Sequence, residues 1–419
     1  MLVKINKILI VLLLLIEVNF FSLFYFPSFI SNYSNYLVKY LSLFLIIIML
    51  LINLIFSNSL HGKLTFGIPI FFLLASVVII TIFSSYHYSQ TILGTGRLSY
   101  YYFIIILYYF LLYYFFSTKN IHFLASTIRL IGVIYSGILI IQILLYLKTG
   151  TFFLNTSSTG LNLSSNILDN DTTIFISGIP RIQQPADFIM FSFLITNIEM
   201  SNKKQRISFK NIIFYVLQLS YLLFIAQTRM YIILSALIII LLVLYKINSR
   251  KRIFWGILML VGIGIFHKYI LYKFGFFSEN RSASTLIRFD ELQYYIPKIF
   301  SNHGFGIGFA DDMEYYFLNH GTFYNADVSS FYFDDIGIMG NMAQLGILGI
   351  MSIIVLIYYL MNFYLKSNNK IIILFIYLYL FVTSISLSVL NVQRIIYLPL
   401  TLYFVTSLFK QGNNNNDVL

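Results

Sequence analysis

The feature that most constrains this chain is a series of long apolar segments that recurs along its whole length. A bilayer core of roughly 30 Å requires about 20 apolar residues per crossing helix. Lipid offers no partner to unpaired backbone groups, so such segments cross as helices. About twelve segments reach this length, centred on residues 8–27, 37–56, 66–84, 98–116, 123–147, 184–200, 210–227, 230–247, 253–271, 340–363, 370–388 and 394–410.

Composition leads to the same fold class. Of the 419 residues, 59% are hydrophobic and only 10% are charged, which is typical of an integral membrane protein. We predict an all-α polytopic protein whose residues 1–419 form a single membrane domain. The chain has no cysteine, which excludes disulfides, thiolate catalysis and cysteine-ligated metals.

Charge placement predicts the orientation of the spans. Lysine and arginine fall in every second connection, whereas most acidic residues fall in the others. Short loops rich in Lys and Arg stay on the cytoplasmic side, so both termini are predicted to be cytoplasmic. The net charge of +12 is therefore a topology signal. Because the basic residues are scattered over many loops, no nucleic-acid partner is expected.

Two external connections stand out by length, at 148–183 and 272–337. Residues 284–299 of the second are predicted to form an amphipathic helix. Ser284 or Thr285 would cap it and Pro297 would bend its end. Its apolar face would consist of Leu286, Phe289, Leu292, Tyr295, Ile296 and Ile299. Residues 411–419, "QGNNNNDVL", are predicted to be a disordered tail.

A glycine-punctuated stretch, "SNHGFGIGFADD", follows at 301–312. Gly304, Gly306 and Gly308 would let the backbone turn tightly beneath a ligand or beside another helix. It is not a phosphate loop, because no Lys-Ser/Thr follows and no strand precedes it.

Four stretches in order resemble the Wzy-type polysaccharide polymerase and O-antigen ligase superfamily, over roughly residues 175–360. They are "PRIQQPADF" (180–188), "AQTRMYIILSAL" (226–237), "STLIRFDELQYYIPKIFSNHGFGIGFADD" (284–312) and "FDDIGIMGNMAQLGILGI" (333–350). The resemblance implies a fold of the GT-C glycosyltransferase class in the bacterial cytoplasmic membrane, with the active site on its outer face. It also implies undecaprenyl-diphosphate-linked oligosaccharide as substrate, and a chain-length regulator and flippase as pathway partners.

The reaction that the resemblance implies can be compared with the residues present. A sugar hydroxyl attacks the anomeric carbon of a saccharide carried on undecaprenyl diphosphate, and the diphosphate leaves as an anion. Arginine suits this step, because its planar fork binds phosphate oxygens bidentately. The predicted binding residues are Arg181, Arg229, Arg288 and Arg394, with the turn glycines Gly306 and Gly308. The alternative for any such arginine is that it reaches lipid headgroups.

The proton acceptor for the attacking hydroxyl is left open by the sequence. Related ligases often carry a His-Asn pair just before the helix that begins here with "GIMGNMAQLG", whereas this chain has "FDDIG". The candidates are His303, Asp334 and Asp335. Asp311, Asp312 and Glu314 lie close together but match no known cation loop, so we predict no metal and no cofactor.

Two ionisable residues lie inside predicted spans and are functional-site suspects by default. Glu17 is expected mid-span, protonated or paired, and Arg129 is expected to reach the cytoplasmic interface. A transporter would instead show inverted repeats, broken helices and charges at the midplane. The sequence predicts spans with little interruption, which favours a polymerase, with a ligase or a flippase as alternatives.

Overall fold

The computed structural model describes residues 2–23, 35–57, 65–151, 153–154, 179, 182, 185–201, 208–247, 279–321, 330–367 and 370–414. Every regular element in these ranges is a helix. In chain order they are α1 (Leu2–Glu17), η1 (Phe20–Leu23), α3 (Asn35–Phe56), α4 (Gly67–His87), α5 (Ile92–Ser99), η2 (Tyr100–Ile106), α6 (Leu107–Tyr114), α7 (Thr118–Thr149), α8 (Ala186–Met200), α9 (Phe209–Ser220), η5 (Tyr221–Ala226), α10 (Arg229–Lys246), α12 (Glu279–Lys298), α13 (Ser301–Gly304), α14 (Asp312–His320), η6 (Phe333–Ile336), α15 (Ile338–Lys366), α16 (Lys370–Ser384) and α17 (Tyr397–Asn414).

The helical membrane class predicted from the sequence is confirmed. Each predicted segment except the ninth, 253–271, overlaps a helix, and that one lies outside the described residues. Within the described ranges, six helices are long and apolar enough to cross a membrane: Leu37–Phe56, Gly67–His87, Thr118–Thr149, Phe209–Ala226, Arg229–Lys246 and Ile338–Lys366. A further apolar helix, Lys370–Ser384, is shorter. The count of twelve spans stays a prediction.

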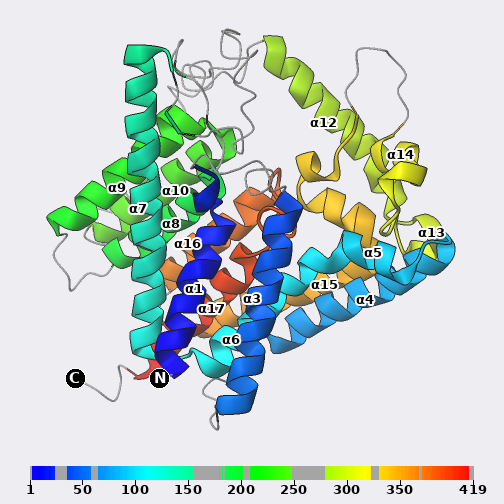
Figure 1. Ribbon diagram of the computed structural model, residues 1–419, viewed down its shortest axis with the longest axis horizontal. Coiled ribbons are helices and arrows are strands. Elements are labelled where there is room, and N and C mark those ends of the chain that lie inside the picture. The colour runs from blue at the N-terminus through cyan, green and yellow to red at the C-terminus, as the bar shows by residue number, and fades with distance from the viewer. Residues whose placement is uncertain are drawn as a thin grey trace.

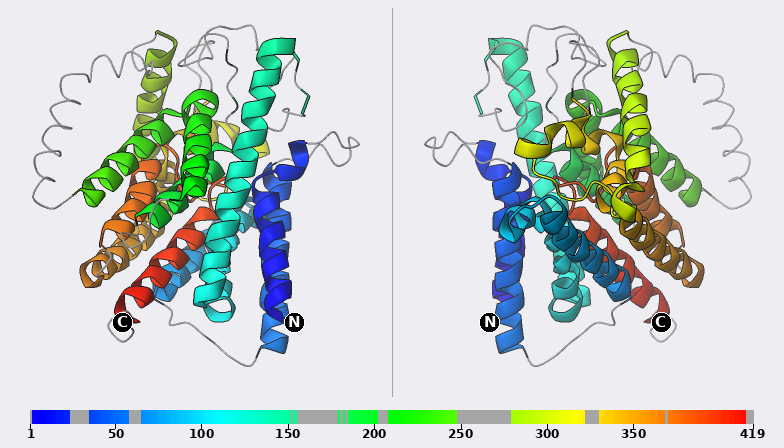
Figure 2. Two further views of the ribbon diagram at one scale, coloured as in Figure 1. Left: turned by 90° about the vertical axis from the view of Figure 1, so that its left-hand side faces the viewer. Right: turned by 90° about the vertical axis from the view of Figure 1, so that its right-hand side faces the viewer.

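The two chain ends lie at the same end of the molecule, and α12 and α14 lie toward the opposite end (Figures 1 and 2). Helix α7, 32 residues long, extends about 48 Å at 1.5 Å per residue and runs the height of the molecule in Figure 1. For brevity we call the end that carries α12 and α14 the distal end.

Helix α8 forms the centre of the bundle. Its residues from Ala186 to Asn197 are buried, apart from partial exposure of Asp187. A helix that is apolar around its whole circumference is one enclosed by others, and α8 packs against α7, α9, α10 and α16. This packing holds the N-terminus of α8, and with it Asp187, in the interior of the distal end.

The spans are interrupted more than the sequence predicts. The segment 92–114 contains the 3₁₀ stretch η2, α9 continues into the π-helix η5, and α15 has a non-helical residue at Gly346 (φ 59°). In η5 the carbonyl of Ile225 accepts a bond from the N–H of Ile182 at 3.1 Å. A π-helix leaves such groups free for partners outside the helix, so the interruption has a tertiary cause.

The glycine turn explains the break in α15. Gly306 and Gly308 have φ of 74° and 71°, and both are buried. Ile307 and Gly308 donate their N–H groups at 2.9 Å to the carbonyls of Ala343 and Gln344, which the kink at Gly346 leaves unpaired within the helix. A Cβ on Gly306 would lie 2.4 Å from the Ala343 oxygen. The turn therefore lies beside a helix, the second of the two alternatives that the sequence left open.

The two suspect ionisable residues inside predicted spans are both paired, and Glu17 does not lie mid-span as expected. Glu17 is the last residue of α1 rather than a mid-span residue, and it forms an ion pair with Lys39 of α3. Arg129 is buried, forms an ion pair with Glu199 and donates to Asn211 Oδ1 at 2.6 Å; its reach to the cytoplasmic interface stays a prediction. Burying a charge without a partner is costly, which explains why α8 and α9 supply these groups.

Three further boundaries differ from the sequence predictions. Helix α12 begins at Glu279, upstream of the predicted start at Ser284. Helix α17 extends to Asn414, into the segment predicted to be a disordered tail. Most of the predicted external loop at 148–183 lies outside the described residues, and α7 runs into it as far as Thr149.

Candidate functional site

Polar side chains gather at the distal end, where several helices begin or end. Arg394, three residues before α17, donates from Nε to Asp187 Oδ1 at 3.2 Å. Asp187 lies in the first turn of α8, and the hydroxyl of Tyr231, in the first turn of α10, donates to the same carboxylate. The positive ends of these helix dipoles therefore meet at one place, which favours negative charge there.

Asp334 joins this cluster from the segment before α15. The amide of Asn391 donates to the Asp334 carbonyl at 3.4 Å, which ties η6 to the turn that carries Arg394. The Asp334 side chain is exposed to solvent, although protein surrounds it at longer range. This burial raises the pKa of the Asp334 carboxyl, the neighbouring Arg394 lowers it, and Asp335 raises it.

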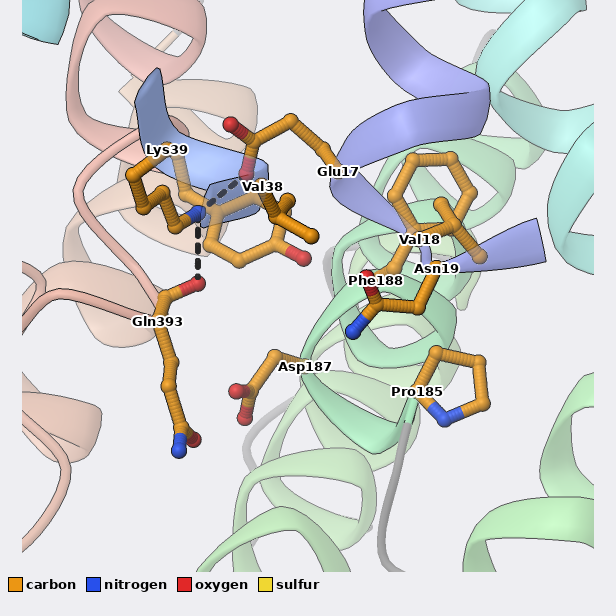
Figure 3. Close-up of a pocket in the computed structure, with 10 residues that line it drawn as sticks. Glu17, Val18, Asn19, Val38, Lys39, Pro185, Asp187, Phe188 and Gln393 are labelled. Atoms are coloured by element: carbon orange, nitrogen blue, oxygen red, sulfur yellow. Dashed lines mark hydrogen bonds and ion pairs between the residues drawn. The ribbon is translucent and has the colours of Figure 1, made fainter. Parts of the chain in front are cut away.

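A small hollow of about 40 Å³, open in part to solvent, adjoins the cluster. Lys39 bridges the Glu17 carboxylate and, at 3.4 Å, the carbonyl of Gln393 (Figure 3). Asp187 and the side chains of Asn19 and Gln393 also line it. The hollow thus presents carboxylates and amides, which are the groups that bind sugar hydroxyls, although no ligand is defined by the geometry alone.

Glu291 of α12 is the most unusual carboxyl outside this cluster. It has no exposed surface. Its Oε1 accepts from the N–H of Tyr332 at 3.2 Å, and its Oε2 has no hydrogen-bond partner among the described residues. Burial raises the pKa of Glu291 to about 7; the Tyr332 N–H bond opposes the shift, Asp335 adds to it and Arg288 opposes it. Because this carboxyl is enclosed, it cannot contact a substrate without movement of α12.

The apolar face of α12 differs from the predicted one. Tyr295 and Ile299 are buried as expected, but Leu286 and Phe289 are 63% and 64% exposed. The helix packs on η6 and α15 only through its second half, and its first half extends beyond the other helices (Figures 1 and 2). Glu291 lies on the face of α12 that packs on the protein, and hydrophobic periodicity could not predict a buried glutamate there.

Of the residues predicted to form the site, Arg394 and Asp334 are brought together, and the charge of Asp335 acts on both Asp334 and Glu291. Arg229 is the first residue of α10 and is half-buried. Arg288 is exposed on α12. Arg181 lies outside the described residues.

His303 is exposed and adopts a left-handed conformation, φ 57°, in the glycine turn. That turn packs on α15 and α4, and α13 lies across the molecule from α8 (Figure 1). The structure therefore does not bring His303 to Arg394. Gly306 and Gly308 face α15 and α4 rather than the hollow.

Sequence reasoning missed Asp187, Lys39 and Tyr231 as site residues. Two signals were present. Asp187 follows Pro185 at the outer end of a predicted span, and Lys39 lies at the outer end of another, against the usual placement of lysine. No local pattern marks Tyr231 among the 34 tyrosines of the chain.

The acidic triplet after the glycine turn serves local structure. Asp311 caps α14 by accepting from the N–H of Met313 at 3.0 Å. Asp312 accepts from Asn319 at 2.6 Å and lies 3.3 Å from His320. Among the described residues no group of three or more His, Asp or Glu side chains is placed to hold a metal ion.

Comparisons with protein-family models, with curated proteins and with solved structures found no match for this chain.

Replacing Glu291 with glutamine is expected to remove a pH dependence from the docking of α12. An unfolded Glu ionises near 4.5, whereas the folded pKa is about 7. The folded state therefore retains a proton that the unfolded state loses, and docking weakens as pH rises from 4.5 to 7, then levels off. The free energy of docking of α12 is expected to fall by on the order of 1–3 kcal/mol over this pH range.

Hydrogen exchange of residues 286–298, corrected for intrinsic rates, measures this docking between pH 5 and 8. Native α12 should lose protection over this range, and the Glu291→Gln protein should not. Glu314→Gln, an exposed position on α14, is the matched control. Equal pH dependence in the native and Glu291→Gln proteins would refute the assignment.

Proposed function

We propose that this protein is a glycosyltransferase that joins undecaprenyl-diphosphate-linked oligosaccharide units into a surface polysaccharide, at the outer face of the bacterial cytoplasmic membrane. The observation that carries the proposal is the placement of Arg394. It is held by Asp187 among converging helix N-termini, beside a carboxyl with a raised pKa. The motif order in the sequence supplies the reaction class.

Arg394 suits a diphosphate leaving group. Asp187 engages its Nε, which fixes the guanidinium while leaving the terminal N–H groups outside that pair. The side chain is 13% exposed, so an entering ligand can reach it while most water is excluded. Charge that develops on a leaving oxygen is stabilised more strongly in such a site than in water.

Asp334 is proposed as the proton acceptor. The acceptor sugar's hydroxyl oxygen forms a bond to the anomeric carbon, and the bond from that carbon to the diphosphate oxygen breaks. The hydroxyl proton passes to the Asp334 carboxylate, and the diphosphate leaves with the bonding electron pair beside Arg394. His303 is exposed at a distance from this cluster, so the placement favours Asp334 over His303 for this role.

The orientation of the site supports an external reaction. The start of α1 and the end of α17 lie at the end of the molecule opposite α12 and α14 (Figure 2). In the predicted topology, the lysine-rich connections lie on the same side of the membrane as the two termini. With cytoplasmic termini, Arg394 and Asp334 would lie on the outer face.

The test is polymerisation by the purified protein, with lipid-linked repeat units as the only substrate and a chelator present. Native protein should give a ladder on a gel, and Asp334→Asn should slow it by about 100-fold or more. Asp290→Asn, the same change at an exposed position on α12, should leave it unchanged. Normal ladders from Asp334→Asn would exclude this carboxyl as the base.

Two alternatives are separated by the same assay. Transfer of finished glycan to a second acceptor, without a ladder, indicates a ligase. A transporter is favoured by one observation, the interruptions at η2, η5 and Gly346, because transporters bind substrates at broken helices. Movement of lipid-linked sugar across vesicles, without any transfer, would establish that function instead.

A further inference from the structure

An open groove runs along the first helix of the bundle, between α1 and α7, which lie side by side (Figures 1 and 2). Its volume is about 470 Å³. It is lined by Lys7, Ile8, Val11, Leu12 and Leu15 of α1 and by Phe123 of α7. Apart from the one lysine this lining is apolar, so the groove suits a hydrocarbon chain.

The two helices touch at both ends of the stretch that holds the groove. Lys7 Nζ lies 4.7 Å from the centre of the Phe123 ring, near the start of both helices. Farther along, the ring of Phe20 in η1 meets that of Tyr135 in α7, with the ring centres 6.1 Å apart. The helices therefore run in the same direction, and the groove is the space that their side chains leave between these two contacts.

The length of the groove matches one leaflet of a bilayer. From Lys7 to Leu15 the helix rises about 12 Å at 1.5 Å per residue, and half of a hydrocarbon core is about 15 Å. Lys7 directly precedes an unbroken apolar run, 8–16, so its ammonium lies where the apolar segment meets water. In the predicted topology this is the cytoplasmic surface.

Positive charge surrounds the end of the groove that carries Lys7. Lys4 is exposed one turn earlier on α1, and Lys119 and His122 are exposed near the start of α7. Helix α7 contains no acidic residue, and α1 contains none before Glu17. In the described part of the chain Lys7 forms no ion pair. An anionic group at this end would therefore meet cations and no carboxylate.

We propose that the groove binds an acyl chain of an anionic phospholipid from the cytoplasmic leaflet, with the lipid phosphate beside Lys7. That leaflet carries the anionic lipids to which basic residues at the membrane surface are attracted. A neutral lipid would leave the charge of Lys7 without a partner. A transmembrane helix of a second copy would need about 30 Å of contact surface, whereas the groove ends after one leaflet. This site is separate from the proposed sugar-transfer site.

The experiment titrates the full protein, purified in detergent, with phosphatidylglycerol or with phosphatidylcholine that has the same acyl chains. Native mass spectrometry measures the lipid retained. The protein should bind one phosphatidylglycerol about fivefold more tightly than phosphatidylcholine, or about 1 kcal/mol for one lysine near the membrane surface. Lys7→Gln should lose this preference. Lys366→Gln, which removes an exposed lysine at the end of α15 outside the groove, should keep it.

A second pair of variants fills the groove. Leu12→Trp places a larger ring in the lining, whereas Leu54→Trp adds the same ring at a 70% exposed position of α3 outside it. Phosphatidylglycerol affinity should fall about tenfold in Leu12→Trp, the cost of excluding roughly two CH₂ groups, and stay unchanged in Leu54→Trp. If Leu12→Trp melts early without lipid, the Lys7→Gln comparison decides the matter.

Three results would overturn the inference: equal affinity of the native protein for both lipids, an unchanged preference in Lys7→Gln, or a dimer without retained lipid that dissociates in Leu12→Trp. The last would assign the groove to a second copy of the chain. Because lipid retention is measured rather than sugar transfer, each result is independent of whether the protein makes a ladder.

Discussion

Arg394→Ala is expected to lower the rate of polymerisation by about 100-fold to 1000-fold, the usual cost of removing one donor to a developing anion. The substitution also leaves Asp187 and the Tyr231 hydroxyl without their cation. Removing one partner of a buried ion pair lowers the stability of the protein by about 3–5 kcal/mol. The rate and the melting temperature of the purified protein measure the two effects.

Arg394→Lys separates catalysis from folding. Lysine keeps the positive charge beside Asp187 but lacks the planar fork that binds two phosphate oxygens. We expect near-native melting with a slower ladder. Arg97→Ala, which removes an exposed arginine of α5, is the control and should have native activity. A native rate from Arg394→Lys would contradict bidentate binding of the leaving group.

Gly306→Ala is expected to have a large effect on stability. The residue has φ of 74°, and an added Cβ would lie 2.4 Å from the Ala343 oxygen and 2.7 Å from the Gly346 nitrogen. Both neighbours are backbone and cannot move aside as a side chain could. Strain and overpacking together should cost about 3 kcal/mol or more, seen as a lower midpoint of thermal unfolding.

Gly96→Ala is the matched control, because a Cβ there meets nothing within 4 Å and the residue lies inside α5. Alanine in a helix is favoured over glycine by about 0.5–1 kcal/mol, so this variant should melt no earlier than the native protein. If Gly306→Ala keeps native stability but loses the ladder, the glycine turn contacts a ligand, as the sequence motif first indicated.

The glycine turn at 304–309 shows which features of the fold follow from a local sequence pattern and which depend on tertiary contacts. The alternation of glycine with apolar residues at 304–309 predicts a tight turn, and the turn is present. Its partner could not be predicted, because Gly306 contacts Gly346 and Ala343, residues of a helix later in the chain. The break in α15 follows from this contact and has no local signal other than one glycine.

In the candidate site, too, some residues were predictable from the sequence and others only from the tertiary structure. Arg394 and Asp334 were predicted because each residue type suits the reaction at the predicted outer end of a span. Asp187 was not, although it holds Arg394, because the two are separated by 207 positions. The burial of Glu291 likewise depends on Tyr332 and η6, which lie beyond the helix that carries it.

The sequence by itself determined the membrane class and the positions of the long apolar helices that the structure describes, because lipid requires long apolar segments and each segment satisfies its own backbone bonds. It also predicted that arginine and acidic residues gather at the outer ends of the spans. Only the tertiary structure decided which of these charges meet: Asp187 with Arg394, and Glu17 with Lys39. The reason is physical, since a buried charge takes its partner from whichever helix packing brings near, and that packing is a property of the whole bundle.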